Sequence, residues 1–137
     1  MVYLAAPWFN EHELNTYNKV LNKLRSQNID VYAPMEHFID NADTMSNEDW
    51  GKAVSEEDLI ALNKCTSVIV LNFGLYSDSG TAWEAGYAFA KGISVTMLVD
   101  DEYESTYSLM VCNGCTTLNN IANFLEDTNN FLCIEQK

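Results

Sequence analysis

Ser67-Val-Ile-Val-Leu-Asn-Phe-Gly74 and the stretch that follows it, Asp78-Ser-Gly-Thr-Ala-Trp-Glu84-Ala-Gly-Tyr-Ala88, decide the fold of this chain. The first run is apolar and β-branched, and it has the length of a strand that is buried on both faces. The second opens with Ser-Gly-Thr, a typical helix start, and then spaces small residues so that the helix can lie close to a sheet. We therefore predict a buried strand, a short loop and a helix that carries Glu84 one turn from its amino end.

Strands and helices alternate along the rest of the sequence. We expect further strands at residues 2–6, 30–33 and 93–99, helices at residues 11–27, 53–64 and about 79–91, and in the tail a helix at 117–125 and a fifth strand at 131–134. Residues 34–52 are polar and acidic without clean periodicity, which is typical of a long loop. The alternation predicts one α/β domain over residues 1–137, with a parallel sheet and right-handed crossovers.

The negative charge of the chain argues against several classes of binding partner. Seven Lys and Arg stand against twenty Asp and Glu, so the formal net charge is −13. Such a surface repels phosphate backbones and anionic membranes, which argues against binding to nucleic acid, lipid surfaces or a highly phosphorylated substrate. A neutral nucleoside meets no such repulsion. Crowded carboxylates also raise the pKa of some of their members, which suits a general acid near neutral pH.

The four cysteines indicate a reduced, cytoplasmic protein. They stand at Cys65, Cys112, Cys115 and Cys133, with no amino-terminal signal sequence and no apolar run near 18 residues. Cys112 and Cys115 have the C-x-x-C spacing, but no second pair and no suitably spaced His completes a metal site, and no helix pattern opens on them. We expect plain thiols in a turn, and neither a metal nor a cofactor.

Four fragments, in this order and spacing, give the chain a family resemblance. They are Tyr3 with residues 5–9, Trp50 eight residues ahead of Asp58, the motif Asp78-x-Gly80-x-x-x-Glu84-x-Gly-Tyr-Ala, and Leu109-Met110. From residue 2 to about 110 the chain resembles the nucleoside 2-deoxyribosyltransferases. The resemblance implies a flavodoxin-like three-layer sandwich with a five-stranded parallel sheet in the order 2-1-3-4-5. In such sheets ligands bind beyond the carboxyl ends of the strands, near the switch point between strands one and three.

The resemblance also implies roles for four residues. Cleaving an N-glycosidic bond requires one group that stabilises an oxocarbenium-like sugar and another that handles the proton of the departing base. Glu84 is the expected nucleophile, held ionised near the positive end of its helix. Asp58 and Asp78 are expected on the base side of the site, where one or both give and recover the proton, and Tyr3 is expected to orient Glu84. Taken alone, Glu84 could be a surface residue, each Asp a helix cap or surface group, and Tyr3 a core residue.

Further residues are candidates for substrate binding. They are Trp8, Phe9 and Trp50 as aromatic faces for a planar base, His37 and Phe38 after the second strand, Gly80 in the motif, and Ser108 with Met110 at the sugar end. Sequence does not separate base stacking from core packing here, and core packing is favoured for Phe9, while His37 could be a solvent-facing loop residue. The family commonly has Asn where this chain has Ser108, supplied by a neighbouring subunit to the sugar 5′-hydroxyl. The resemblance thus implies a homo-oligomer and leaves this contact open.

Three functions stand side by side at this point. The first is transfer of a 2-deoxyribosyl group from a deoxynucleoside to a free nucleobase, through a covalent glycosyl-enzyme with retention. The second is an N-glycosidase in which water takes the sugar, although residues 77–80 and 108–113 contain no Lys or Arg for a nucleotide phosphate. The third is a non-catalytic flavodoxin-like module. Residues 6–9 do not form a phosphate loop for flavin, and Asn72-Phe-Gly74 stands where a receiver domain needs Asp.

Overall fold

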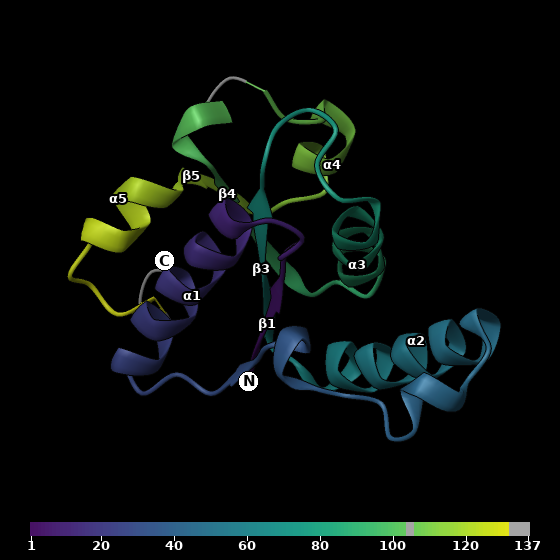
Figure 1. The fold of residues 1–137 in the computed structure, drawn as a ribbon. Coiled ribbons are helices and arrows are strands. Elements are labelled where there is room, and N and C mark those ends of the chain that lie inside the picture. Colours follow the sequence, from purple (N-terminus) through teal and green to yellow (C-terminus); the bar gives the residue numbers. More distant parts are fainter. Residues whose placement is uncertain (104–105, 132–137) are drawn as a thin grey trace.

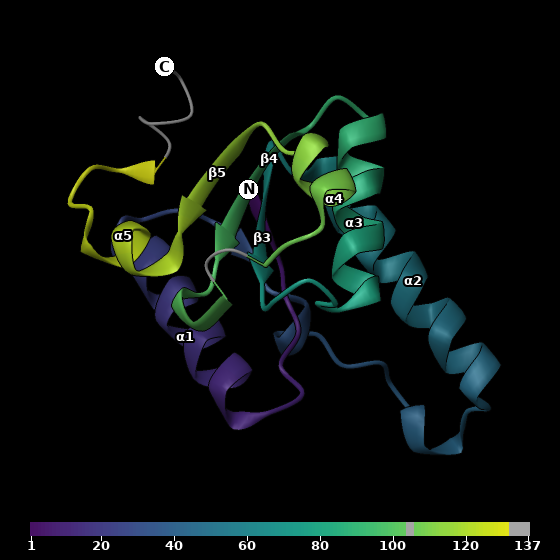
Figure 2. The same cartoon turned by 90° about the horizontal axis from the view of Figure 1, so that it is seen from above.

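The computed structural model describes residues 1–103 and 106–131 and contains one five-stranded parallel sheet in the order β2-β1-β3-β4-β5 (Figures 1 and 2). The strands are β1 (Val2–Ala5), β2 (Val31–Tyr32), β3 (Ser67–Asn72), β4 (Ser94–Val99) and β5 (Thr117–Asn120). Every neighbouring pair is parallel. The flavodoxin-like strand order that the sequence implied is therefore confirmed.

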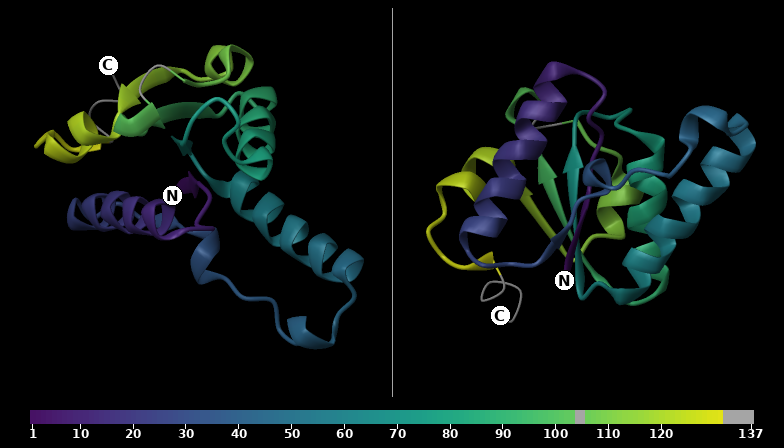
Figure 3. Two further views of the ribbon diagram at one scale, coloured as in Figure 1. Left: turned by 45° about the horizontal axis from the view of Figure 1, so that its top comes forward. Right: turned by 60° about the horizontal axis from the view of Figure 1, so that its bottom comes forward.

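Helices cover both faces of this sheet. They are α1 (Glu11–Ser26), α2 (Asn47–Lys64), α3 (Ser79–Ala90), α4 (Leu109–Asn113) and α5 (Ile121–Glu126), with short 3-10 turns η1 (Pro34–Glu36), η2 (Ala42–Thr44) and η3 (Asp101–Tyr103). Helices α1 and α5 lie on one face, and α3 with α4 on the other (Figures 1 and 3). None of the helices in the described part of the chain is long and apolar enough to span a membrane.

The central strand β3 divides the core into two halves. All six of its residues are buried, and their side chains alternate between the faces of the sheet. Ile69 and Leu71 pack on the α1 and α5 side, and Val68 and Val70 on the α2 and α3 side. Strand β1 alternates in the same way, so that Tyr3 joins the second half of the core and Leu4 the first. Adjacent residues of one strand thus serve opposite faces.

Helix α2 begins at Asn47, well before the start at residue 53 that the sequence suggested. Ser46 caps it by accepting a hydrogen bond from the Asp49 backbone N–H at 3.1 Å, and acidic residues in the first turn suit the positive end of the helix. Periodicity missed this turn because it is exposed to solvent. The amino-terminal half of α2 projects away from the sheet, with η2 beside its start (Figure 3).

The carboxyl-terminal part of the fold also differs from the expectation. Residues 117–120 form edge strand β5 instead of the first turn of a helix, and only Ile121–Glu126 is helical. The side chains of β5 are largely exposed, so no apolar alternation marks it in the sequence. The strand predicted at 131–134 lies outside the described residues except for Phe131, which is buried beside Phe124. The short helix α4 was not predicted.

Candidate active site

Tyr3, Asp58 and Glu84 come together on the α2 and α3 face of the sheet. Tyr3 points from β1 and is fully buried, whereas Asp58 on α2 and Glu84 on α3 are half-buried. The Tyr3 hydroxyl lies close enough to both carboxyls to lower the pKa of each. Even so, among the described residues the Tyr3 hydroxyl and Oε2 of Glu84 are buried without a hydrogen-bond partner of normal geometry. Buried polar atoms of this kind cost about 1–3 kcal/mol each, and they are concentrated at functional sites.

Burial sets the charge of Glu84. Burial is the largest cause, and together with the negative charges of Asp58 and Asp78 it raises the pKa of this carboxyl to about 8, while the hydrogen-bonding effect of the Tyr3 hydroxyl lowers it. The expectation that Glu84 is held ionised is therefore wrong for the protein by itself. Its position near the start of α3 does not compensate for the loss of water around a buried oxygen.

Asp58 also holds its proton more tightly than an exposed aspartate. Burial is the largest cause of its raised pKa, and Glu57 adds to it, while Tyr3, Tyr32 and His37 lower it. The sequence predicted a raised pKa for some of the acids, but from crowded carboxylates and not from burial. Asp58 lies deep within α2, which begins at Asn47, so desolvation is the stronger effect.

Asp78 is the N-cap of α3. Its Oδ2 accepts hydrogen bonds from the Thr81 backbone N–H at 2.8 Å and from the Thr81 hydroxyl at 2.9 Å. A Cβ on Gly80 would lie 3.2 Å from the same oxygen, so the glycine leaves room for the capping carboxylate. The structure thus shows the capping role for Asp78, and the charge of this residue also acts on Glu84.

A groove next to Asp78 brings in the sugar-end candidate Ser108. Loop residues 75–78, the first turns of α3 and the start of α4 line it, including Ser77, Asp78 and Ser108. Ser108 caps α4 by accepting a hydrogen bond from the Val111 N–H at 3.4 Å. The next residues are strongly exposed, Leu109 by 73% and Met110 by 84%. Met110 therefore faces outward within a single chain.

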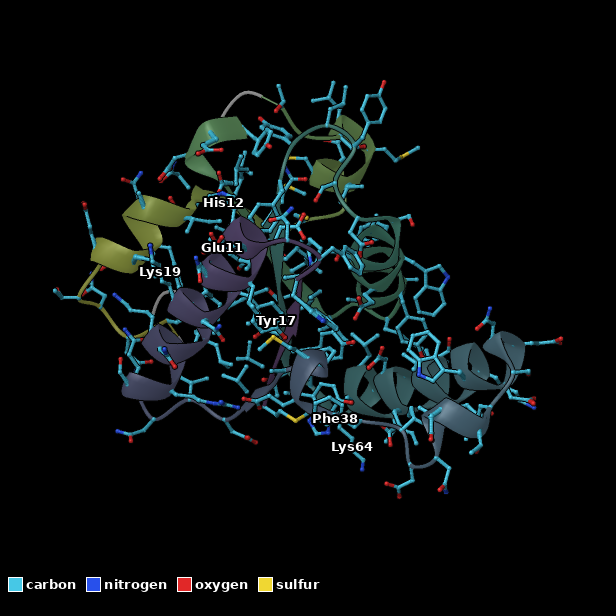
Figure 4. All side chains as sticks on the ribbon, viewed as in Figure 1. Glu11, His12, Tyr17, Lys19, Phe38 and Lys64 are labelled. Atoms are coloured by element: carbon cyan, nitrogen blue, oxygen red, sulfur yellow. The ribbon has the colours of Figure 1, made fainter. Side chains whose placement is uncertain are left out.

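The aromatic candidates are mostly at the surface. Phe9 is 77% exposed and stacks on Trp8, so the alternative that placed it in the core is wrong. Phe38 is 84% exposed and lies on the α2 side of the molecule in Figure 4. Trp50 is in the first turn of α2, and eight residues of helix put it about 12 Å along the axis from Asp58. Within one chain Trp50 therefore does not flank the carboxyl cluster.

Sequence reasoning missed Tyr32, which stands between Tyr3 and His37. Its ring stacks on Tyr3 with centroids 5.3 Å apart and on His37 with centroids 4.1 Å apart. Burial and the charge of Asp58 raise the pKa of Tyr32 to about 12. The sequence did place Tyr3 and Tyr32 on two predicted strands. It did not give the strand register that pairs these two residues, so their contact could not be predicted.

One cluster among the described residues offers metal ligands. His12, Asp100 and Glu102 place ligand atoms within 4.8 Å of one another at the carboxyl end of β4. His12 Nε2 already pairs with Asp100 Oδ2 at 3.0 Å, and the edge of Phe73 contacts the imidazole ring. Figure 4 shows His12 at the start of α1, which lies on the opposite face from α3. Tyr3, Asp58 and Glu84 are not members of this cluster.

A parallel open sheet with Glu84 on the helix after the central strand and Asp58 near it is compatible with enzymes that act on glycosidic bonds, which use two carboxyl groups. Comparison with known families identifies the particular class of enzyme. The family model described as Nucleoside 2-deoxyribosyltransferase matches residues 2–130. The chain belongs to the nucleoside 2-deoxyribosyltransferase family and is an enzyme of that class. This membership sets aside the non-catalytic flavin or receiver module.

Solved structures agree with this assignment. The chain is similar to a 2-deoxyribosyltransferase from the psychrotolerant bacterium Bacillus psychrosaccharolyticus, with 25% identity, a TM-score of 0.81, and coverage of 97% of this chain and 94% of that one. Its fold is also similar to that of a conserved protein from Enterococcus faecalis (20% identity, TM-score 0.76, coverage 91% and 94%). A third similar fold is that of the CMP N-glycosidase BcmB of Clostridium botulinum, with 22% identity, a TM-score of 0.61, and coverage of 91% of this chain and 93% of that one. A comparison with curated protein sequences finds no match.

Proposed function

We propose that this enzyme transfers the 2-deoxyribosyl group of a deoxynucleoside to a free nucleobase with retention, through a covalent sugar on Glu84. The observation that carries the proposal is the cluster of Tyr3, Asp58 and Glu84, with two buried polar atoms that lack a partner. Family membership and the likeness to a 2-deoxyribosyltransferase support the reaction class. The structure supplies two carboxyls of unequal environment, which is what a retaining glycosyl reaction uses.

The reaction has two matched steps. First, the Glu84 carboxylate bonds to the anomeric carbon while the C–N bond breaks, and the departing base takes its electron pair and a proton from Asp58. Second, a nitrogen of the acceptor base attacks the same carbon from the face the first base left, the bond to Glu84 breaks, and Asp58 recovers the proton. Two displacements at one carbon retain its configuration.

The raised pKa of both carboxyls suits this scheme. Neighbouring acids resist double ionisation, so the pair of Asp58 and Glu84 holds one proton over a range of pH. The reactive form has the proton on Asp58 and the charge on Glu84. A hydrogen bond donated by the Tyr3 hydroxyl stabilises the charge on Glu84, so Tyr3 favours this distribution.

The charge around the site favours a nucleoside over a nucleotide. The amino end of α3, where an open sheet would offer backbone donors to a phosphate, is occupied by the Asp78 carboxylate. The groove from Asp78 to Ser108 has no Lys or Arg among the described residues that line it. A 5′-phosphate would meet negative charge there, so a substrate with a free 5′-hydroxyl is the better match.

Hydrolysis at the same site is the second candidate. His37 is exposed and stacks on Tyr32, whose ring in turn stacks on Tyr3, so solvent reaches this edge of the cluster in a single chain. Water attacking the glycosyl-enzyme in place of a base would make the protein a deoxynucleoside N-glycosidase. Exclusion of water by a closed site decides between the two outcomes.

We also propose that the protein works as a homo-oligomer in which residues 108–110 of one chain approach the site of another. Two large apolar side chains of this segment, Leu109 and Met110, are among the most exposed in the described chain. Trp83 and Ile60 on α3 and α2 are each 56% exposed as well. Sedimentation should give a mass above that of one chain, and a fully active monomer would contradict the proposal.

Product analysis with and without an acceptor base tests the function. The protein is incubated with a deoxynucleoside alone and together with a different free base, and the products are separated. We expect the new nucleoside only when the acceptor is present, and a mass adduct on Glu84 with a slow fluorinated deoxynucleoside. Release of free sugar at the same rate in both incubations would favour hydrolysis, and no reaction in either would overturn the proposal.

A further inference from the structure

Three side chains with metal-ligating atoms meet at the carboxyl end of β4, beside the start of α1. His12 is in the first turn of α1 (Figure 4), Asp100 directly follows β4, and Glu102 lies in η3. One ligand atom from each lies within 4.8 Å of the others, and His12 Nε2 is 3.0 Å from Asp100 Oδ2. Two ligands that bind one ion at about 2.1 Å stand about 3.0–3.4 Å apart, so this pair is already at ligand spacing.

Hydrogen bonds and one ring contact hold the three ligands in place. The Asp100 backbone N–H donates to the Asn72 carbonyl oxygen at 3.0 Å, which ties Asp100 to the end of β3. Asp100 Oδ1 accepts the Glu102 N–H at 3.1 Å, so Oδ2 is the oxygen that faces His12. The edge of Phe73 contacts the imidazole ring, with centroids 5.9 Å apart. The ligand set is thus largely preformed, which lowers the entropic cost of binding.

The Asp100 carboxylate lacks a permanent positive partner. Its side chain is 7% exposed, and in the described part of the chain its one ion pair is with His12. An imidazole is positively charged only when both of its nitrogens carry a proton. Asp101 and Glu102 follow directly and add negative charge, and buried charges are stable chiefly when they are paired or bind a metal. This corner of the protein therefore favours a cation.

Two features oppose a cation here, and both are weaker than the acids. The α1 dipole places about half a positive charge near His12, but Glu11 and Glu13 in the same turn offset it. Lys19 lines a hollow beside the cluster, yet among the described residues it forms no ion pair with Asp100. The net charge of the chain, −13, adds a long-range attraction for cations.

We propose that His12, Asp100 and Glu102 form a binding site for a divalent first-row metal ion. The ion binds the lone pair of His12 Nε2 and one oxygen of each acid; the imidazole keeps a proton on Nδ1, and any second proton passes to solvent. A hollow of about 590 Å³ beside His12 and Glu102 has room for waters that complete the coordination. Such an ion joins α1 to the end of β4.

The proposed site does not depend on the proposed function, since the reacting carboxyls lie elsewhere. The sequence predicts no metal, because 88 residues separate His12 from Asp100 and only the fold brings them together. Mixed imidazole and carboxylate ligands suit ions such as Mn²⁺, Fe²⁺ and Zn²⁺. Mn²⁺ is the best probe, because it favours carboxylate and water ligands over the thiols of Cys112 and Cys115.

Binding of Mn²⁺ to the full chain, with free Mn²⁺ counted by electron paramagnetic resonance, provides the test. We expect one saturable site per chain, and an affinity at least about tenfold weaker in His12→Ala. Glu102→Gln keeps the size of an exposed side chain and removes its charge, so it should weaken binding by a similar factor with the fold intact. The matched control His37→Ala removes the other histidine of the chain and should bind as wild type does.

Two further readouts separate this site from diffuse attraction to an acidic surface. Bound Mn²⁺ should broaden the NMR signals of the His12 imidazole before those of His37. At about a hundredfold excess over Kd it should raise the Tm of wild type by about 5 °C and leave that of His12→Ala unchanged. Binding that does not saturate, equal affinity of wild type and His12→Ala, or earlier broadening of His37 would each overturn the site.

Discussion

Tyr3 and Tyr17 are both completely buried, on opposite faces of the sheet, but their hydroxyl groups differ in hydrogen bonding. The Tyr17 hydroxyl, on the α1 side, donates a hydrogen bond to the Leu4 carbonyl oxygen at 3.5 Å, and the edge of Trp8 packs against its ring. The Tyr3 hydroxyl, on the α3 side, has no such partner among the described residues. The acids repeat the contrast, because Asp100 pairs with His12 and Oε2 of Glu84 stays unpaired.

The contrast separates folding from function within one small core. On the α1 face Tyr17 and Asp100 have partners within the protein, although the Ser67 hydroxyl, which shares the strand alternation of Ile69, is buried without one. The polar groups left without a partner on the α3 face are costly, by about 1–3 kcal/mol for each unsatisfied group, which natural proteins retain chiefly where the group has another use. Variants on the two faces should reveal whether the unsatisfied groups are the reactive ones.

The largest effect should come from Glu84→Gln. The amide has nearly the shape of the acid but cannot bond to the sugar, so transfer should fall by more than about a thousandfold. Product formation from a deoxynucleoside and an acceptor base measures the loss, and circular dichroism checks the fold. On the opposite face, Asp100→Asn should leave most of the activity. Equal activity of Glu84→Gln and wild type would dismiss the nucleophile.

Asp58→Asn should give the next largest effect, and it tests whether Asp58 and Glu84 have different roles. Without its proton donor the enzyme should cleave an ordinary deoxynucleoside about a hundredfold more slowly. A nucleoside with an already acidic base needs no donor, so its cleavage should change far less. The ratio of the two rates is the measurement, and an unchanged ratio would remove Asp58 from the donor role.

The charge of Glu84 should also be visible in stability. Its folded pKa of about 8 lies above the ordinary 4.5, so its contribution to stability is complete below about pH 4.5 and is lost as the pH rises through 8. Wild type should therefore lose stability relative to Glu84→Gln between pH 5 and 9, by on the order of 4 kcal/mol. Urea denaturation at several pH values measures the difference. A constant difference across this range would mean that Glu84 is not buried as described.

Tyr3→Phe and Tyr17→Phe test the comparison directly and should give the smallest effects. Tyr17→Phe loses a made hydrogen bond, so its free energy of unfolding should fall by about 1 kcal/mol with activity retained. Tyr3→Phe loses no bond of normal geometry, so stability should hold or rise while activity falls about tenfold. Urea denaturation and initial rates on both variants give the answer. The reverse pattern would end the distinction between the faces.

Much of the fold was readable from the chain, and the exceptions have physical reasons. The apolar run of β3 and the small residues of α3 are recognisable in the sequence. A strand buried on both faces, and a helix packed closely on it, tolerate few other residue types. Edge strand β5 and the first turns of α2 are exposed, so burial left no pattern there. Phe9 is exposed as well, although its apolar side chain had suggested a place in the core.

By itself the sequence determined the order of the elements as far as β4, the family, and the residue types able to carry the chemistry, because these depend on local patterns and on motif spacing along the chain. Only the tertiary structure decided how those residues behave. It capped α3 with Asp78, aligned Tyr32 with Tyr3 through strand register, and removed water from Glu84, which raised its pKa to about 8. Protonation and hydrogen bonding depend on what lies across space from a group, and chain spacing does not encode that distance.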